Sequence, residues 1–591
     1  MKLLKRIDPY ALLLCVLVFG VSLSVVNISA PLTEGWWHVY ARWIDQGRIP
    51  YKDFELLVPP GYPYLMWLLT HIVGEQFLHL RTLGCLLESV IAVQLFYIFK
   101  GLIGRFLAFS LAFFGTVYLY SGTASITYDY HYFAVFFLLG AGLLLQKSNF
   151  FNTNAFSKAD SRLYVMAGFC IALSSLIKQT YAITFALFII FYFAVRAAYK
   201  YQLWKILLIK LVHLLAPWVL VLSIVSFYFS INGAFNQMLQ QIFSGALEVK
   251  GSADTVAFAW LNGLWSPYWI SYNLRAAAVF VFICFIASRL LKRWVIFKNT
   301  PSSENLTLAF TSSIFVVALT LLRINHLNLT DELPNQIWQS LYEVLFLAPL
   351  LVLAYMFLKF RNSDSSWVPL ILLALAFAWG NGMSAGLTEY GTFLSSITAF
   401  AFIVWSFGSN KIIAIFTLIT IFVTSTAIYG NKLAVPYSWW GYSTPTAAEA
   451  TVTSSIGLTK GLKFSNSGYK EFNNVYRQLN NLSCPGEVIG YPNMPLFALD
   501  ADLLPQGRVG VYWFDFVGKR SFDQEVKRLK NVQIAAIVEL PLQNALNQHE
   551  LLFGNELSLS RSRFDVFLEK YQKENDSIMG RTLKIKVSVC K

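Results

Sequence analysis

Long apolar runs recur along the first three quarters of the chain, and they restrict its fold more than any other feature. The clearest are residues 11–26, 106–120, 133–145, 183–195 and 277–287. The apolar core of a bilayer is about 30 Å thick, and a helix needs roughly 20 mostly apolar residues to cross it. The alternating segments of about ten residues that a membrane β-barrel requires do not occur. The sequence therefore predicts an α-helical polytopic membrane protein.

Charged residues are scarce, which supports the same fold. They make up 13% of the 591 residues, whereas soluble proteins carry about 25%. Hydropathy predicts about 13 transmembrane helices, the first of which resembles a signal peptide without a convincing cleavage site. The predicted spans are 10–30, 80–100, 106–121, 127–146, 163–179, 181–198, 206–230, 271–290, 306–322, 338–358, 367–380, 390–407 and 411–429.

The positions of the basic residues predict the orientation. With strict alternation, every basic cluster between spans falls on one side, and short loops rich in Lys and Arg face the cytoplasm. The N-terminus is then cytoplasmic and the C-terminal part extracytoplasmic, in the inner (plasma) membrane. The net charge of +14 is explained by this topology, and it favours attraction to anionic membrane lipid. No nucleic-acid partner is therefore predicted. The clusters are Lys2, Lys5 and Arg6; Lys100 and Arg105; Lys147, Lys158 and Arg162; Arg196, Lys200 and Lys205; Arg289, Lys292, Arg293 and Lys298; Lys359 and Arg361; and Lys411.

Two domains are predicted. Residues 1–430 form a transmembrane domain, with a first outer loop at 31–79 and a second long outer loop near 231–270, which is interpreted as a mobile flap. Residues 431–591 form an extracytoplasmic α/β domain. The sequence leaves open whether its Cys484 and Cys590 are bonded. Its expected elements are helices at 469–482 and 522–529 and strands at 487–491, 532–538 and 582–589.

Unusual polar residues gather in the outer loops and at the outer ends of spans. A transporter usually keeps such residues near the midplane of the bilayer. In the first outer loop, Glu34 precedes a run rich in tryptophan and tyrosine at 36–43. This pattern predicts a short helix at 34–45 that lies in the membrane interface. Pro59 and Pro60 then predict the start of a second surface helix, because proline is tolerated in a first helical turn.

This loop resembles the first outer loop of the GT-C glycosyltransferases. That superfamily includes protein O-mannosyltransferases and the bacterial enzymes that attach aminoarabinose to lipid A. Their loop carries an acidic residue soon after helix one, then an amphipathic helix and a proline-containing stretch, which Glu34 and Pro59-Pro60 match. The usual Asp-Glu pair is Thr33-Glu34 in this chain. This difference leaves open the type of acceptor and whether a divalent metal ion takes part or no cofactor is required.

The resemblance implies transfer of a sugar from a polyprenyl-phosphate donor to a hydroxyl of a lipid, glycan or protein acceptor. A carboxylate near the interface can act as general base, which contributes about 10²–10⁴-fold to the rate. Glu34 is the first candidate for this base. Asp53 is the second, either as a helper or as a binder of sugar hydroxyls. A helix-starting acid favoured by the helix dipole is the alternative interpretation of Glu34.

Lys178 lies at the outer turn between the fifth and sixth spans, in an otherwise apolar hairpin on the side that the charge rule disfavours. A lysine in this position costs free energy, which the phosphate of a lipid donor would offset. Related enzymes place a basic residue near here for the donor phosphate. We therefore predict a substrate-binding role for Lys178, with a structural role as the alternative.

Five further residues are candidates for substrate binding. Asp129 and His131 open the fourth span. Interfacial anchoring by the tyrosines around them is an equal alternative for Asp129 and the favoured interpretation for His131. Arg323 and His326 follow the ninth span, and an arginine fork suits phosphate recognition, but an ordinary surface loop explains them as well. Arg81 opens the second span and is a weaker candidate.

Two other functions are compatible with such a chain. A transporter or flippase of lipid-linked sugars would place titratable residues deep inside the spans and show inverted-repeat symmetry. A glycan polymerase or ligase with a diphosphate-linked donor would favour paired arginines in a large outer loop. The sequence shows neither pattern, so transfer from a lipid-phosphate donor is the preferred hypothesis.

Overall fold

The computed structural model describes sixteen stretches of the chain, and the account below concerns these stretches alone. Three predicted spans, at 271–290, 306–322 and 338–358, lie outside them, as do most of the predicted flap and the four residues Arg323, His326, Cys484 and Cys590. The described residues are 8–29, 34–120, 126–148, 150–151, 156–199, 204–245, 366–385, 389–406, 411–439, 442–443, 445–482, 485–513, 517–539, 564–569, 577–579 and 584–587.

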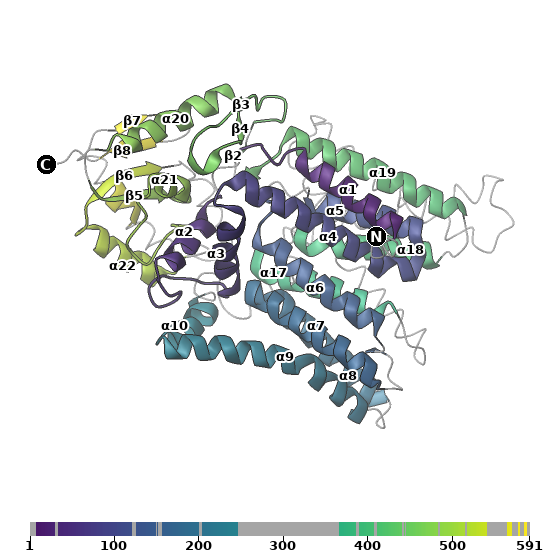
Figure 1. Ribbon diagram of the computed structural model, residues 1–591. Coiled ribbons are helices and arrows are strands. Elements are labelled where there is room, and N and C mark those ends of the chain that lie inside the picture. The colour runs from purple at the N-terminus through teal and green to yellow at the C-terminus, as the bar shows by residue number, and fades with distance from the viewer. Residues whose placement is uncertain are drawn as a thin grey trace, which may run out of the picture.

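A bundle of apolar helices makes up the larger part of the described structure (Figure 1). By length and composition, 4 of the described helices can cross a membrane. The predicted helical membrane fold is confirmed, and a helix occupies each predicted span that is described, while the total count stays a prediction. The four are α4 (Phe77–Ile103), α7 (Lys158–Ile177), α8 (Gln179–Tyr199) and α9 (Trp204–Ile231), and the bundle also contains α1 (Pro9–Leu23), α5 (Arg105–Tyr120), α6 (Tyr130–Lys147), α17 (Val368–Ala385), α18 (Glu389–Ser406) and α19 (Lys411–Ala434).

Side-chain caps determine where two of these helices begin. The Asp8 carboxylate accepts a hydrogen bond from the Tyr10 N–H at 3.1 Å, and Pro9 occupies the first turn of α1. Asp129 caps α6 in the same way, accepting from the His131 N–H at 2.9 Å. An N-cap side chain satisfies one of the free N–H groups of the first turn. The cap at Asp129 therefore fixes the position of the His131 ring on the first turn of α6.

Glycines allow very close helix packing at two positions. A Cβ on Gly84 of α4 would lie 2.3 Å from the carbonyl of Thr127, and one on Gly168 of α7 would lie 2.1 Å from the carbonyl oxygen of Leu214 in α9. Small residues are common at such contacts in membrane helices. The Thr127 hydroxyl also donates to the carbonyl of Arg81 at 2.7 Å. The start of α4 is thus held against the segment that leads into α6.

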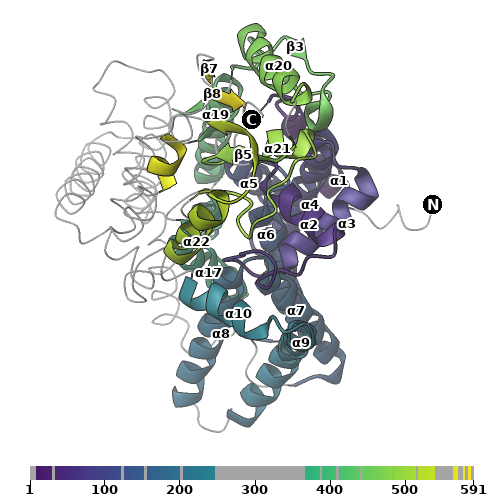
Figure 2. The same ribbon diagram turned by 90° about the vertical axis from the view of Figure 1, so that its left-hand side faces the viewer.

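Two short helices of the first loop lie at one end of the bundle, which we call the loop end. They are α2 (Trp36–Asp45) and α3 (Gly61–Val73), and they agree with the two surface helices predicted from the sequence. Figures 1 and 2 show the C-terminal part at the same end, whereas α1 begins towards the other end in Figure 1. Past α9, at the loop end, lie α10 (Phe235–Leu239) and the π-helix η3 (Gln240–Gly245).

The C-terminal part contains a four-stranded mixed sheet in the order β5-β6-β8-β7. The first pair is parallel and the other two pairs are antiparallel. The predicted strand at 487–491 has these bounds in the structure, and the other predicted elements agree within a few residues. The sheet strands are β5 (Glu487–Tyr491), β6 (Ile534–Glu539), β7 (Ser577–Met579) and β8 (Lys584–Val587); the helices are η5 (Gly457–Thr459), α20 (Asn466–Asn480), α21 (Pro495–Asp500) and α22 (Lys519–Leu529); and the short strands are β1 (Ser438–Trp439), β2 (Tyr442–Ser443), β3 (Val452–Thr453) and β4 (Lys463–Phe464).

The apolar core continues from the helix bundle into the C-terminal part. One cluster of buried side chains contains Ile91 and Phe377 from the bundle together with Phe464 and Leu496 from the C-terminal part. A second, smaller cluster lies against the sheet, around Phe522 among others. Burial of shared apolar surface stabilises the contact between the two parts. The predicted domain boundary at residue 430 stays a prediction.

Candidate active site

The first polar cluster joins Glu34 to Arg81 at the loop end. The Nε of Arg81 donates to one carboxylate oxygen of Glu34 at 2.7 Å, and its Nη2 donates to the other at 2.5 Å. Both side chains have a relative exposure of 0%. This is a bidentate pair, the geometry in which an arginine fork and a carboxylate fit best. The sequence placed Arg81 among the weaker candidates for substrate binding, but here it is the direct partner of Glu34.

Other groups complete the surroundings of this pair. The Tyr128 hydroxyl donates to Glu34 at 3.1 Å, and Arg81 donates to the carbonyls of Val26 and Ile28 at 2.8 and 2.5 Å. The Arg81 guanidinium also lies 5.0 Å from the ring centre of Tyr437, just past α19. A buried ion pair needs such additional hydrogen bonds to offset desolvation. Both oxygens of Glu34 accept hydrogen bonds, and its ion pair with Arg81 favours the ionised carboxylate, so it is a weaker base in this arrangement than a carboxylate without a cationic partner.

The second polar cluster contains three of the residues predicted from the sequence. The Asp129 carboxylate lies 2.5 Å from Nδ1 of His131, and Nε2 of His131 lies 2.6 Å from the ammonium of Lys178. Lys178 and His131 are buried at the loop end, between α7 and α8 and on the first turn of α6. An ammonium only donates hydrogen bonds. The imidazole Nε2 is therefore the acceptor from Lys178, and Nδ1–H donates to Asp129.

Asn381 of α17 and two tyrosines enclose the ammonium of Lys178. Asn381 accepts from Lys178 at 3.3 Å and from the hydroxyl of Tyr181 at 2.6 Å. The ammonium also lies 4.7 Å from the ring centre of Tyr181 and 5.3 Å from that of Tyr130, distances that permit cation–π attraction. Asn381 was not among the candidate residues predicted from the sequence. Its contact with Lys178, 203 positions away, requires the packing of α17 on α8.

Aromatic side chains connect the two clusters. The Tyr62 hydroxyl donates to the carbonyl of Tyr128, which itself binds Glu34. The Tyr62 ring lies 5.9 Å from that of Tyr130, which in turn lies beside Lys178. Trp37 of α2 contacts Tyr62 and Tyr130, with ring centres 4.7 and 5.4 Å apart. Edge-to-face ring contacts of this kind add about 0.5–1.5 kcal/mol per pair beyond the burial of apolar surface, so the rings form a packed connection between the two clusters.

His38 is a buried titratable group that the sequence did not single out as a candidate. Its Nε2 lies 3.2 Å from the carbonyl oxygen of Glu75, and its ring faces that of Phe77 at 4.9 Å. Burial lowers the pKa of His38 to about 4. The imidazole is therefore neutral at physiological pH. One turn before it in the chain, Glu34 binds Tyr128, whose ring centre lies 6.1 Å from that of His38.

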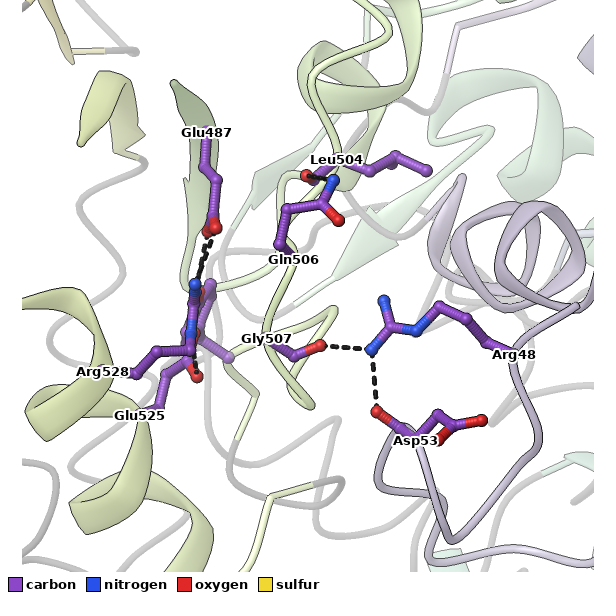
Figure 3. A network of polar contacts seen from close by, with 9 residues as sticks. Arg48, Asp53, Glu487, Leu504, Gln506, Gly507, Glu525 and Arg528 are labelled. Atoms are coloured by element: carbon purple, nitrogen blue, oxygen red, sulfur yellow. Dashed lines mark hydrogen bonds and ion pairs between the residues drawn. The ribbon is translucent and has the colours of Figure 1, made fainter. Parts of the chain in front are cut away.

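Asp53 belongs to a separate arrangement at the edge of the first loop. Its carboxylate accepts from the N–H of Ile49 at 2.7 Å, and its carbonyl accepts from Arg48 at 2.7 Å (Figure 3). These bonds close a turn of the loop against the C-terminal part. The contacts described here give Asp53 a part in this turn, while its predicted role towards substrate stays a prediction. Among the described residues, no group of three or more His, Cys, Asp or Glu side chains is arranged to hold a metal ion.

Comparison with known proteins adds a structural likeness. No family model and no curated protein matches the chain. It is similar to the oligosaccharyltransferase of Archaeoglobus fulgidus in complex with Zn and sulfate, with 13% identity over 93% of this chain and 70% of that chain, at a TM-score of 0.49. A structure of the Archaeoglobus fulgidus enzyme AglB with an inhibitory peptide and a dolichol-phosphate has 13% identity over 93% and 72% of the two chains, at a TM-score of 0.45.

A bacterial structure shows a likeness over more of its own length. ArnT from Cupriavidus metallidurans bound to undecaprenyl phosphate has 12% identity over 98% of this chain and 97% of that chain, at a TM-score of 0.38. AglB and ArnT are GT-C membrane glycosyltransferases, the group that the first loop resembles.

Proposed function

We propose that this protein is a membrane glycosyltransferase that moves a sugar from a polyprenyl-phosphate donor to an acceptor hydroxyl on the extracytoplasmic face. The observation that carries the proposal is the ammonium of Lys178, which is buried at the loop end between an imidazole and an amide oxygen. A compact ammonium is a common ligand of phosphate. Its place at the ends of α7 and α8 is where the headgroup of a lipid donor would lie.

The reaction breaks the bond between the anomeric carbon and the phosphate oxygen, and forms a bond from that carbon to the acceptor oxygen. The departing polyprenyl phosphate gains negative charge, which Lys178 stabilises. A fixed positive charge in a site that excludes water stabilises such a leaving group strongly. Asn381 helps to aim the ammonium, because it accepts one of its hydrogen bonds at 3.3 Å.

The proton of the acceptor hydroxyl has two candidate acceptors. When a phosphate takes hydrogen bonds from Lys178, Nε2 of His131 becomes available as a base, and Asp129 at 2.5 Å stabilises the imidazolium that forms. Glu34 is the base predicted from the first loop, but its bidentate pair with Arg81 lowers its basicity. The geometry favours His131. A His131→Gln variant that keeps full transfer would leave Glu34 as the base.

Binding of polyprenyl phosphate alone tests the donor site without knowledge of the sugar. Purified protein in lipid nanodiscs is titrated with polyprenyl phosphate, and binding is measured by native mass spectrometry. Loss of one charge-assisted hydrogen bond, worth about 1.5–3 kcal/mol, predicts at least a tenfold weaker affinity for Lys178→Met. Lys147→Met, which removes a lysine at the other end of α6, is the matched control and retains affinity. Equal affinities in the two variants would remove Lys178 from the donor site.

Transfer itself is measured with a panel of radiolabelled polyprenyl-phosphate sugars. The proposal expects release of polyprenyl phosphate from at least one donor by the wild-type protein and loss of release in Lys178→Met. If lipid-linked sugar instead crosses a vesicle membrane unchanged, the protein is a flippase and not a transferase.

A further inference from the structure

Hydrogen bonds attach the first loop to the C-terminal part at several points. The N–H of Glu55 donates to the carbonyl of Arg508 at 2.8 Å, and the Arg508 guanidinium donates to the carbonyl of Tyr51 at 2.6 Å. The N–H of Gly518 donates to the Glu55 carboxylate at 3.3 Å. These bonds join positions more than 450 residues apart in the chain. The conformation of the loop thus depends on the C-terminal part.

Arg42 of α2 forms the first strong point of this attachment. Its Nε and Nη2 bind the two carboxylate oxygens of Glu75 at 3.2 and 2.7 Å, and Nη1 donates to the carbonyl of Leu499 at 2.8 Å and to Asp502 at 3.3 Å. The Arg42 guanidinium lowers the pKa of Glu75 by hydrogen bonding and charge. One planar guanidinium therefore connects α2, the segment before α4 and α21. All three guanidinium nitrogens of Arg42 donate hydrogen bonds in one plane, and the single nitrogen of a lysine cannot reproduce this geometry.

Arg48 forms the second point (Figure 3). Its Nη2 donates both to the carbonyl of Asp53 at 2.7 Å and to that of Gly507 at 2.5 Å. Its guanidinium also lies 4.2 Å from the ring centre of Trp43 in α2. A single nitrogen makes both hydrogen bonds, so an ammonium with three donors can replace it.

A second ion cluster on the C-terminal side supports the turn at Gly507. Arg528 binds Glu487 at 2.6 and 2.7 Å and Glu525 at 2.7 and 3.0 Å, as Figure 3 shows. A Cβ on Gly507 would lie 2.5 Å from Nε of Arg528 and 2.6 Å from a Glu525 oxygen. The turn can approach this cluster only because residue 507 is glycine. The cluster therefore fixes the position of the turn at Gly507, whose carbonyl accepts a hydrogen bond from Arg48.

The attachment reaches the first polar cluster of the candidate site. Gly35 begins α2 with φ +102°, and a Cβ there would lie 3.1 Å from the Leu499 side chain and 3.5 Å from the backbone nitrogen of Leu496. Helix α21 therefore packs directly against the residue that follows Glu34. Any shift of α21 moves the start of α2, and with it Glu34 and Trp37.

We propose that the C-terminal part positions the first loop for transfer through Arg42 and Arg48, which we call the arginine clamp. The inference rests on the proposed function, since it assigns these two arginines as positioning residues for that same site. Neither residue contacts Lys178 or His131 in the structure described here. The clamp acts by holding α2, whose Trp37 contacts Tyr130, one of the two tyrosines beside Lys178. Loss of the clamp then lowers turnover without weakening the donor-phosphate site.

Variants of the two arginines test the clamp. Arg42→Met and Arg48→Met should lower kcat on the order of 10-fold to 100-fold, because small misplacements of catalytic geometry have effects of this size. The KM for the lipid donor and the affinity for polyprenyl phosphate should stay at wild-type values. Arg48→Lys should restore turnover, whereas Arg42→Lys should not. Arg477→Met, in the exposed face of α20, is the matched control with wild-type turnover.

Hydrogen exchange separates failure of the clamp from failure of the proposed function. Both methionine variants should show faster amide exchange at residues 36–45, with no change in the thermal midpoint of the helix bundle. Unchanged exchange at 36–45 in Arg42→Met overturns the clamp, even if transfer is observed. Faster exchange together with no transfer in any donor assay by the wild-type protein retains the clamp and refutes the transferase.

Discussion

The buried pair of Glu34 and Arg81 makes the strongest quantitative prediction. The pair has no solvent exposure and two hydrogen bonds of 2.7 and 2.5 Å. In a Glu34→Gln variant, the Arg81 guanidinium loses its counter-charge while it remains buried. At an effective dielectric constant of about 20 and a charge separation of about 4 Å, the lost Coulomb attraction is about 4 kcal/mol.

The surroundings of Arg81 reduce this cost. Its bonds to the carbonyls of Val26 and Ile28 remain in the variant, and the oxygen of the introduced amide still accepts one hydrogen bond. Breaking a buried pair by removal of one partner costs about 3–5 kcal/mol, so we expect about 3 kcal/mol. That value corresponds to roughly a hundredfold larger unfolding constant. Replacement of both partners, as in Glu34→Leu with Arg81→Met, should cost much less, because no unpaired charge stays buried.

Reversible unfolding by SDS in mixed micelles, followed by tryptophan fluorescence, measures these differences. The single variants Glu34→Leu and Arg81→Met, measured beside the double variant, complete a cycle that isolates the coupling between positions 34 and 81. An unfolding free energy of Glu34→Gln within about 1 kcal/mol of wild type would refute a closed, buried pair. The same result would make Glu34 more available as a base. Activity of Glu34→Gln is informative only at a temperature where the variant is shown to be folded.

Three further predictions concern stability. Burial raises the pKa of Asp500 to about 6, so the free energy of unfolding falls as the pH rises from about 4 to 6 and the carboxyl ionises. Asp500→Asn should therefore raise the thermal midpoint at pH 7.5 but not at pH 4. Burial lowers the pKa of His38 to about 4. Acidification from about pH 6.5 to 4 should therefore destabilise the wild type, because the unfolded chain binds the proton first. Thermal melts at pH 5 and 7.5 should show a smaller loss of stability in His38→Gln. Gly168→Ala places a Cβ 2.1 Å from the carbonyl oxygen of Leu214 and should lower the free energy of unfolding in SDS by about 1–3 kcal/mol. Gly101→Ala, with no atom within 4 Å of its Cβ, is the control and should leave that free energy unchanged or raise it.

The helices were predictable because their signal is local. A run of apolar residues such as 411–429 needs no knowledge of its neighbours, and the structure has a helix at Lys411–Ala434. The strand at 487–491 was also predicted from a local pattern, and all five of its residues are buried in the structure. Such patterns indicate whether a segment is surrounded by lipid, protein or water. They do not indicate which side chains are in contact.

Partners within the candidate site were harder to predict, because they come from distant elements. The sequence marked Lys178, His131 and Asp129 one by one, and their alignment in a single row depends on the cap of α6 and the turn between α7 and α8. The pairing of Glu34 with Arg81 had a weak signal, since both charges lie near the same ends of adjacent helices. Arg42 and Arg48 had none, because each also binds a backbone carbonyl of the C-terminal part, that of Leu499 or Gly507, and a backbone carbonyl leaves no mark on the sequence.

The two buried cations of the loop end differ in how readily they can exchange partners. Arg81 has an ionised carboxylate on both arms of its fork and two carbonyls besides, so an incoming phosphate would have to replace a charged partner of equal geometry. The contacts of Lys178 with His131 and Asn381 are to neutral acceptors, which bind an ammonium less strongly than a phosphate oxygen does. Of the acceptors described here, a phosphate oxygen would be the stronger partner for Lys178, whereas at Arg81 it would replace an ionised carboxylate. This difference is the reason to propose the donor phosphate at Lys178, although both residues are basic, buried and at the same end of the bundle.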